Sequence, residues 1–259
     1  MKLIFLLRNL WLVADFFVKA WLLSLIHRDS IKRRRALARN VSRSAKKFCN
    51  SLNISLSLKH PDILKEYRDR PYLLVANHSS YADVLALASL EELVFITSVE
   101  MGNNPFLGAI TRLGGCLYTN RKNPMSLKDE IARFSSTISE GFKVVLFPEG
   151  TSTNGSRIKD FRRSLFQIPL NVNCPILPVC IKYTKIDGKP VTDSNRDLIA
   201  WYGDMTFAPH FLKLQNHFFE AEITFLDPIV QPAGKTRTEL SDRVLQQMRN
   251  CFSANNDFI

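Results

Sequence analysis

The chain has 259 residues, of which 46% are hydrophobic and 23% charged, so it is long enough to bury the core of one α/β domain. Its net charge of +11 is concentrated at one end: residues 1–50 contain twelve Lys or Arg and two Asp, which leaves only +1 for the rest. A body with so little excess charge argues against nucleic acid as a partner, because phosphate contacts require a basic surface.

A strongly apolar segment begins the chain. Residues 3–26 are interrupted by Arg8, Asp15 and Lys19, which fall within a narrow arc when the residues are placed on a helix. The uncharged runs are far shorter than the roughly 20 residues that a membrane-spanning helix needs. A cleaved signal peptide fits poorly, because charges lie inside the apolar segment and a basic run follows it. The sequence therefore predicts a helix with one thin charged stripe.

A basic amphipathic helix is predicted over residues 30–52, after a hinge at residues 27–30 and a cap at Asp29 or Ser30. Its apolar face consists of Leu37, Val41, Ala45, Phe48 and Leu52. Such a helix after an apolar one is typical of a pair lying in the membrane interface, where each Lys or Arg adds about 1 kcal/mol of attraction to anionic lipid. The alternatives are a solvated charged face, a nucleic-acid arm or a single span. We expect residues 1–52 to form a membrane-associating helical pair and residues 53–259 to form one domain.

Five cysteines are present, and none of them forms a CxxC pair. This pattern indicates reduced thiols in a cytoplasmic setting. The histidines are scattered without metal-ligand spacing, so we predict no metal site.

Beyond residue 53, short apolar runs alternate with helical patterns. Strands are expected within residues 53–58, 73–76, 93–97, 116–119, 143–147, 176–183 and 217–226. Helices are expected over residues 81–90, 105–113, 126–140 and 236–252, with a short one inside 201–215. Strands that alternate with helices predict an α/β fold, here a single largely parallel sheet flanked by helices.

Polar loops follow three of these strands, at residues 77–80, 120–122 and 148–157. Parallel topology would bring the three loops to one edge of the sheet, where ligands bind in such folds. Gly150 and Gly155 have the separation of a P-loop, but the Lys-Ser/Thr pair that a P-loop needs is missing. A GxSxG nucleophile elbow is also missing.

The first of these loops carries His78, and Asp83 follows five residues later. Ser80 and Asp83 fit a capping box, which requires no catalysis. An acid in the first helical turn can also point back toward the loop, which would place its carboxylate near His78. The two interpretations are compatible. Ser79 and Ser80 are alternative nucleophiles, although a serine adjacent to its base in sequence is poorly placed to reach it.

Four ordered blocks resemble those of the glycerolipid acyltransferases, the family of 1-acylglycerol-3-phosphate acyltransferases and related lysophospholipid acyltransferases. The blocks are Asn77-His78-x4-Asp83, Arg121 after a strand, Phe147-Pro148-Glu149-Gly150-Thr151, and Ile176-Leu177-Pro178-Val179. Each block alone is weakly specific, whereas their order and spacing together are specific. The N-terminal helical pair is similar to the membrane-docking element of bacterial members. The resemblance implies that residues 53–259 form an acyltransferase domain.

The resemblance also implies roles for individual residues. His78 would be the general base and Asp83 its orienting partner, so that a lysolipid hydroxyl attacks the thioester of acyl-coenzyme A or acyl carrier protein, with no further cofactor. Base catalysis of this kind typically contributes about 10²–10⁴-fold to a rate. Arg121, Glu149, Gly150 and the adjacent Thr151 would position the acceptor. As isolated residues, Arg121 would be interpreted as a solvated charge and Glu149 as a helix cap.

The implied function is acyl transfer to a lysophospholipid, foremost to 1-acylglycerol-3-phosphate, which gives phosphatidic acid. Members acting on that acceptor commonly have an arginine after the FPEGT threonine, where this chain has Ser152. A lysolipid with another head group, such as lyso-ornithine lipid, is therefore an alternative, and Arg157, Lys159, Arg162 and Arg163 are candidates to replace the missing charge. A serine lipid hydrolase is the second alternative. The expected location is the cytoplasmic face of a bacterial inner membrane, with anionic lipid as the surface partner.

Overall fold

The computed structural model describes residues 2–230 and 232–254. Within these residues the strands are β1 (Ile54–Lys59), β2 (Leu73–Ala76), β3 (Leu93–Ser98), β4 (Leu117–Thr119), β5 (Lys143–Leu146), β6 (Ile176–Ile186), β7 (Lys189–Pro190) and β8 (Phe219–Phe225). The α-helices are α1 (Lys2–Ile26), α2 (Ser30–Ser51), α3 (Pro61–Glu66), α4 (Tyr81–Leu90), α5 (Val99–Asn103), α6 (Leu107–Leu113), α7 (Leu127–Ser139), α8 (Gln167–Val172), α9 (Phe207–Leu214) and α10 (Arg237–Ala254). Short 3₁₀ helices cover Pro124–Ser126, Arg163–Phe166 and Arg196–Leu198.

The strands form one sheet in the order β1-β8-β6-β2-β5-β3-β4, with β7 paired to β6. From β6 to β4, each strand is parallel to its neighbour. β8 is antiparallel to β6, and β1 is parallel to β8. The prediction of a single, largely parallel sheet flanked by helices is confirmed. The loops after β2, β4 and β5 consequently leave the sheet at the same edge.

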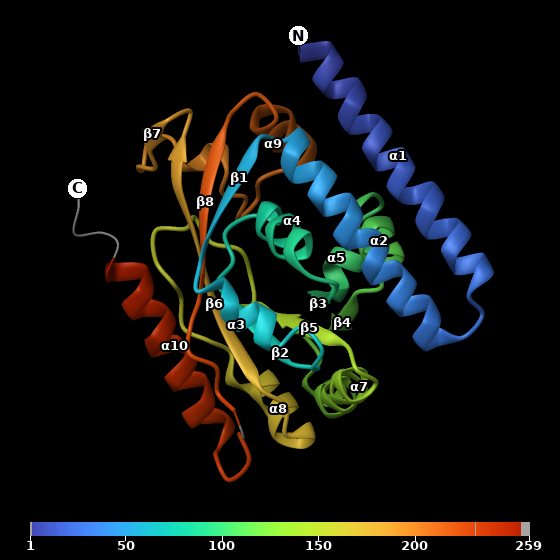
Figure 1. Cartoon of the computed structure of the whole chain (residues 1–259), viewed down its shortest axis with the longest axis vertical. Helices are drawn as coiled ribbons and strands as arrows, with labels where there is room; N and C mark the ends of the chain where they lie inside the picture. Colours follow the sequence, from blue (N-terminus) through green and yellow to red (C-terminus); the bar gives the residue numbers. More distant parts are fainter. Residues whose placement is uncertain (1, 231, 255–259) are drawn as a thin grey trace.

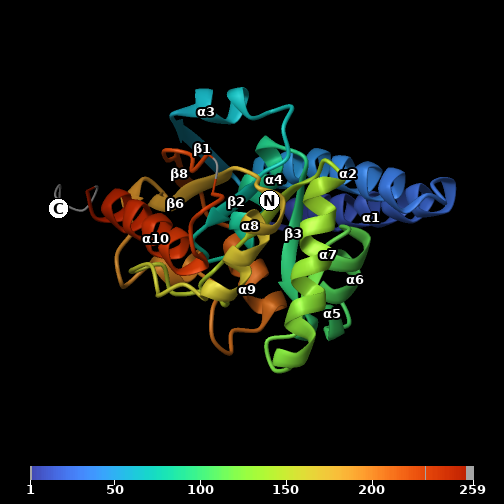
Figure 2. The same cartoon turned by 90° about the horizontal axis from the view of Figure 1, so that it is seen from below.

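Helices cover both faces of the sheet (Figures 1 and 2). Along β2, Leu74 and Ala76 belong to a buried cluster with α2 and α4, whereas Leu73 and Val75 belong to a second cluster with α7, α8 and α10. All four side chains are buried. A strand buried on both faces explains why this segment is continuously apolar and not alternating.

The second helix, α2, lies between α1 and α4 (Figure 1). Asp29 caps α2, because its carboxylate accepts a hydrogen bond of 2.8 Å from the Lys32 amide, as predicted for this hinge. Ala45, Cys49 and Leu52 of the apolar face join the same hydrophobic cluster as α4. The apolar face of α2 thus packs inside the protein, whereas the sequence interpretation placed this helix in the membrane interface with that face toward lipid. The division of the chain after residue 52 stays a prediction.

The first helix, α1, turns its polar stripe toward the rest of the protein. Arg8 Nε donates to Ser51 Oγ over 2.8 Å, and Lys47 Nζ lies 3.1 Å from an Asp15 carboxylate oxygen. The opposite face of α1 is apolar and exposed at Leu3, Ile4, Leu7, Leu10, Trp11, Val18, Trp21, Leu22, Leu25 and Ile26. Among the described helices, none combines the length and the apolar character needed to cross a membrane.

Several short elements were not predicted or were predicted with other bounds. The helix expected over residues 105–113 is α6, and it is preceded by the separate helix α5, whose N-cap Ser98 accepts a hydrogen bond from the Met101 amide. α3 and α8 have six residues each. Six residues are fewer than two helical turns, which is too few for a hydrophobic period to be visible in the sequence.

Candidate active site

The loop after β2 is held by its neighbours on both sides. The side-chain amide of Asn77 donates to the Ile181 carbonyl and accepts from the Ile181 amide, each over 2.8 Å, which fixes the loop to β6. The amide of His78 donates to Glu149 Oε1 over 2.8 Å, and its carbonyl accepts from the Thr153 amide over 3.0 Å. The backbone of His78 is therefore fixed by the loop that follows β5.

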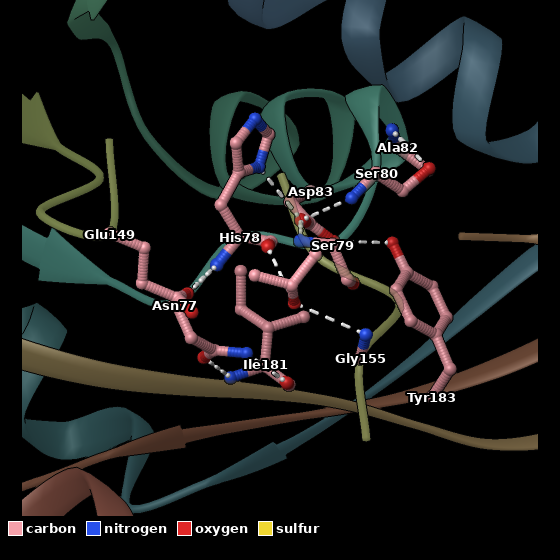
Figure 3. Close-up of polar contacts among 11 residues, drawn as sticks. Asn77, His78, Ser79, Ser80, Ala82, Asp83, Glu149, Gly155, Ile181 and Tyr183 are labelled. Atoms are coloured by element: carbon pink, nitrogen blue, oxygen red, sulfur yellow. Dashed lines mark hydrogen bonds and ion pairs between the residues drawn. The ribbon is translucent and has the colours of Figure 1, made fainter. Parts of the chain in front are cut away.

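The imidazole of His78 lies beside the carboxylate of Asp83 (Figure 3). His78 Nδ1 is 3.0 Å from Asp83 Oδ2, and the Asp83 side chain is fully buried. The same oxygen accepts the amides of Ser79 and Ser80 over 2.7 and 2.8 Å, and Oδ1 accepts the hydroxyl of Tyr183 over 2.8 Å. The structure thus brings together the two residues that the sequence proposed as a catalytic pair.

The capping box is also formed. Ser80 is the N-cap of α4, its hydroxyl accepts the Ala82 amide over 3.2 Å, and Asp83 accepts the Ser80 amide in return. One carboxylate therefore caps the helix and contacts the histidine, so the two interpretations of Asp83 hold together.

The geometry leaves the second ring nitrogen of His78 for chemistry. Because Nδ1 is engaged with Asp83, Nε2 is the nitrogen that remains to accept a proton. The ring stacks on Phe147 with centroids 4.1 Å apart, and 19% of the His78 side chain is exposed. In the described part of the chain, neither the Ser79 nor the Ser80 hydroxyl hydrogen-bonds to the imidazole, which removes the contact that a serine nucleophile needs.

Glu149 lies behind the histidine loop. It is 6% exposed, and its two carboxylate oxygens accept the backbone amides of His78 and Lys159, each over 2.8 Å. Burial raises the pKa of Glu149 above its usual value, while the two amide donors oppose that shift. In this position Glu149 ties the loop after β2 to the loop after β5.

Arg121 and Gly150 meet at a cavity of about 190 Å³ beside Phe147. Arg162, one of four basic residues that the sequence left as candidates, lines the same cavity. Gly150 has φ of +74°, and a Cβ there would lie 2.6 Å from Arg162 Nε, so the arginine side chain crosses the glycine closely. Thr151 is exposed and does not line this cavity.

A larger cavity of about 360 Å³ also borders the histidine loop, at Asn77 and Ser79. Ser79, Gly155 and Arg196 are among its lining residues, and His78 is not. The smaller cavity is therefore the one adjacent to the proposed chemistry, because Phe147 both lines it and stacks on the imidazole.

Tyr183 contacts Asp83 of the candidate catalytic pair, although the sequence gave no role to this tyrosine. Burial is the main cause that raises the pKa of its hydroxyl, followed by the charge of Asp83, so the tyrosine donates as a neutral group. The one feature of the sequence that could have pointed to Tyr183 is its position on β6, the strand that begins with the Ile176–Val179 block. Within residues 2–230 and 232–254, no group of three His, Cys, Asp or Glu side chains is placed to hold a metal ion.

Comparisons with known proteins agree with this geometry. A family model described as Acyltransferase matches residues 58–182. The lyso-ornithine lipid O-acyltransferase of Rhizobium meliloti is 32% identical over 195 residues, which are 72% of this chain and 66% of that protein. The enzyme of the same name from Pseudomonas aeruginosa is 30% identical over 70% of this chain and 67% of that protein. The chain thus spans about two thirds of the length of these relatives.

A 1-acyl-sn-glycerol-3-phosphate acyltransferase of Neisseria gonorrhoeae is 27% identical over 45% of this chain and 46% of that protein. Among solved structures, the 1-acyl-sn-glycerophosphate acyltransferase PlsC of Thermotoga maritima superposes with a TM-score of 0.65. That match covers 100% of this chain and 99% of the other at 19% identity, and it supports the fold. With the sequence relatives and the family model taken together, the chain belongs to the lysophospholipid acyltransferase family.

Proposed function

We propose that this protein transfers an acyl group from an acyl thioester to the hydroxyl of a lysolipid. The observation that carries the proposal is the contact between His78 Nδ1 and the buried carboxylate of Asp83, which leaves Nε2 as a base at the carboxyl edge of a parallel sheet. Membership in the acyltransferase family supports the same chemistry.

In the proposed mechanism, His78 Nε2 removes the proton of the acceptor hydroxyl as the oxygen attacks the thioester carbonyl. Asp83 fixes the tautomer of the ring and stabilises the imidazolium that forms. Collapse of the tetrahedral intermediate expels the thiolate, which takes the proton from the imidazolium. A covalent enzyme intermediate is not needed, because the thiolate of coenzyme A or of acyl carrier protein is a good leaving group. Arg121 and Gly150 would contribute to acceptor binding at the neighbouring cavity.

We propose lyso-ornithine lipid as the first acceptor to test. Support comes from relatives with that name in Rhizobium, Brucella, Rhodobacter and Pseudomonas species, and from Ser152 in place of the arginine that is common in enzymes for 1-acylglycerol-3-phosphate. The phosphate acceptor is the second candidate, favoured by the two arginines at the cavity beside Phe147.

The proposed reaction is tested with purified protein, one acyl-coenzyme A and a panel of lysolipids, with products identified by mass. We expect His78→Ala to fold, to bind liposomes and to lose acyl transfer by at least about 10²-fold. Turnover near that of the wild type would refute His78 as the base. Release of free fatty acid without any acceptor, blocked by a serine-directed phosphonate, would favour a hydrolase instead.

We further propose that the exposed apolar face of α1 docks on the cytoplasmic leaflet of a membrane. Trp21 and Leu25 are each 57% exposed on this face, and Lys47 of α2 lies 5.7 Å from the ring centroid of the exposed Trp11. Because transfer of a large apolar side chain out of water contributes about 1.5–3 kcal/mol, Trp21→Gln with Leu25→Gln should lower the vesicle partition coefficient by more than about tenfold. The control Val230→Gln changes a residue that is 54% exposed and that follows Ile229, the residue bridged to Ile176 at the start of β6. Equal binding by the two variants would contradict α1 docking.

A further inference from the structure

The helix α9 and the segment that leads into it contact the histidine loop and the helix that follows this loop. The backbone amide of Trp201 donates to the Ser79 carbonyl over 2.8 Å. The hydroxyl of Tyr81, the first residue of α4, lies 3.0 Å from Nδ1 of His210 in α9. In sequence, the two contacts therefore lie on either side of Ser80, the N-cap of α4.

The contact between Tyr81 and His210 joins two neutral groups inside the protein. His210 is 6% exposed, and burial lowers the pKa of its imidazole below the usual value, so the ring is neutral near pH 7. Burial likewise raises the pKa of the Tyr81 hydroxyl, so the tyrosine keeps its proton. Because a neutral imidazole has one acceptor nitrogen, Nδ1 can accept this proton in a hydrogen bond. The hydroxyl end of the tyrosine is thereby fixed to α9.

The ring of Tyr81 is held by the same part of the chain. It meets Trp201 and Phe207 edge-on, with centroids 5.9 and 5.1 Å apart. Trp201 thus contacts the tyrosine ring with its side chain and the histidine loop with its backbone. His210 follows Tyr81 by 129 residues, so only the fold brings this support to the start of α4.

The supported backbone is the part that holds Asp83. The amides of Ser79 and Ser80 donate to Asp83 Oδ2 over 2.7 and 2.8 Å (Figure 3). The same oxygen lies 3.0 Å from His78 Nδ1. A shift of the Ser79 backbone or of the first turn of α4 would therefore move the carboxylate relative to the imidazole. A misplacement of about 1 Å in a catalytic site can cost about 10²-fold in rate.

On the basis of the proposed acyl transfer, we propose that Tyr81 and His210 are positioning residues, which hold the start of α4 in the geometry that the base needs. Both act through the backbone around Ser80 and the carboxylate of Asp83. Loss of their hydrogen bond should lower kcat and leave KM for both substrates unchanged, because the residues that bind the substrates keep their places.

The kinetic test compares Tyr81→Phe with the matched control Tyr202→Phe. Each variant loses one tyrosine hydroxyl from this region, but the Tyr202 hydroxyl donates to Asp197 over 3.1 Å at the surface. We expect Tyr81→Phe to lower kcat about 10- to 100-fold, with KM for the acceptor and for the acyl thioester within about twofold of the wild type. Tyr202→Phe should keep kcat within about twofold.

A second pair of variants changes the other partner of the hydrogen bond. His210→Leu removes the acceptor, whereas His210→Asn can place a polar atom near the position of Nδ1. We expect His210→Leu to match Tyr81→Phe and His210→Asn to recover part of kcat. The double variant Tyr81→Phe/His210→Leu should be no slower than either single variant, because all three lack the same bond. Equal kcat in His210→Asn and His210→Leu would contradict this role.

A measurement without turnover separates the positioning role from the proposed reaction. The proton between His78 Nδ1 and Asp83 is followed by NMR in protein with isotope-labelled histidine, and His78→Ala assigns its signal. It should exchange with water faster in Tyr81→Phe than in the wild type and in Tyr202→Phe. If no lysolipid is acylated while this difference is found, the acyl transfer fails and the positioning role stands.

Three results would overturn the proposal. The first is a kcat of Tyr81→Phe within twofold of the wild type. The second is a rise in KM for either substrate at unchanged kcat, which would make Tyr81 a binding residue. The third is an exchange rate of the His78 proton that is the same in Tyr81→Phe as in the wild type.

Discussion

Replacing Asp83 with asparagine separates its two roles, because the substitution preserves the shape of the side chain. The carboxylate holds four donors: His78 Nδ1, the amides of Ser79 and Ser80, and the Tyr183 hydroxyl. An asparagine can direct its carbonyl oxygen at the first three, and its amide group at the tyrosine oxygen. The capping contact and the ring tautomer are thereby retained, whereas the negative charge beside the imidazole is lost.

The size of the expected effect follows from that charge. The ring nitrogen and the carboxylate oxygen are 3.0 Å apart, which places the two charge centres at roughly 4 Å once His78 is protonated. At an effective dielectric constant of about 20, two unit charges at that separation attract by about 4 kcal/mol. Because each ~1.4 kcal/mol corresponds to a factor of ten, Asp83→Asn should lower kcat by about 10³-fold. Its free energy of unfolding should change by no more than about 2 kcal/mol, since three contacts persist unchanged and the Tyr183 contact persists with its direction reversed.

The matched control is Ser80→Ala, which removes the hydroxyl that accepts the Ala82 amide and leaves Asp83 in place. Loss of such an N-cap costs about 1 kcal/mol of stability, and kcat should stay within about threefold of the wild type. Both variants are measured by urea denaturation and by initial rates of acyl transfer at saturating substrates. If Asp83→Asn is folded and keeps kcat within tenfold of the wild type, Asp83 is a helix cap and the catalytic assignment is wrong.

Two further predictions concern residues around this pair, and a third concerns Asp15 of α1. Tyr183→Phe removes one hydrogen bond to the buried Asp83, so it should cost about 1.5–3 kcal/mol in urea denaturation and lower kcat more than KM; an unchanged stability would contradict the contact. Glu149→Ala leaves two backbone amides without acceptors and should destabilise by about 2–5 kcal/mol, and a melting temperature equal to the wild type would oppose this role. Hydrogen bonding to Lys19, with Lys47 contributing, lowers the pKa of Asp15, so its contribution to α1 docking on α2 is present above about pH 4 and is lost as the pH falls through the lowered value. Lower protection factors against hydrogen exchange in α1 below that pH would support the prediction, and protection factors that do not change with pH would refute it.

The strands of the sheet could be predicted because their apolar runs are bounded by polar loops. The α/β class and the position of His78 at a strand end followed from that alternation. The reversed direction of β8 could not be predicted, because the apolar pattern of a strand does not record which neighbour it pairs with or in which direction. The sequence also could not show which side of α1 faces outward. Its three charged residues indicated a polar stripe, and only the structure shows that this stripe faces α2.

In the site, the sequence identified residues whose chemistry is apparent from their type and missed those whose role depends on tertiary contact. His78 and Asp83 could be paired because they lie on one loop and one helical turn. Tyr183 lies 100 residues away from Asp83 in sequence, so nothing local connects the two. Arg162 was one of four equivalent candidates until its approach to Gly150 distinguished it.

The contacts around His78 determine which kinetic parameter a substitution near the ring should change. Asn77 ties the loop to β6, Glu149 and Thr153 hold the His78 backbone from the loop after β5, and Asp83 holds the ring from α4. The contacts come from three different parts of the fold, so the ring orientation depends on the packing of the sheet and not on the loop alone. A rigid base of this kind gains its rate from fixed geometry. Substitutions at these supports should therefore reduce kcat while KM for both substrates changes little, in contrast to substitutions at Arg121 and Arg162, which should act on acceptor KM.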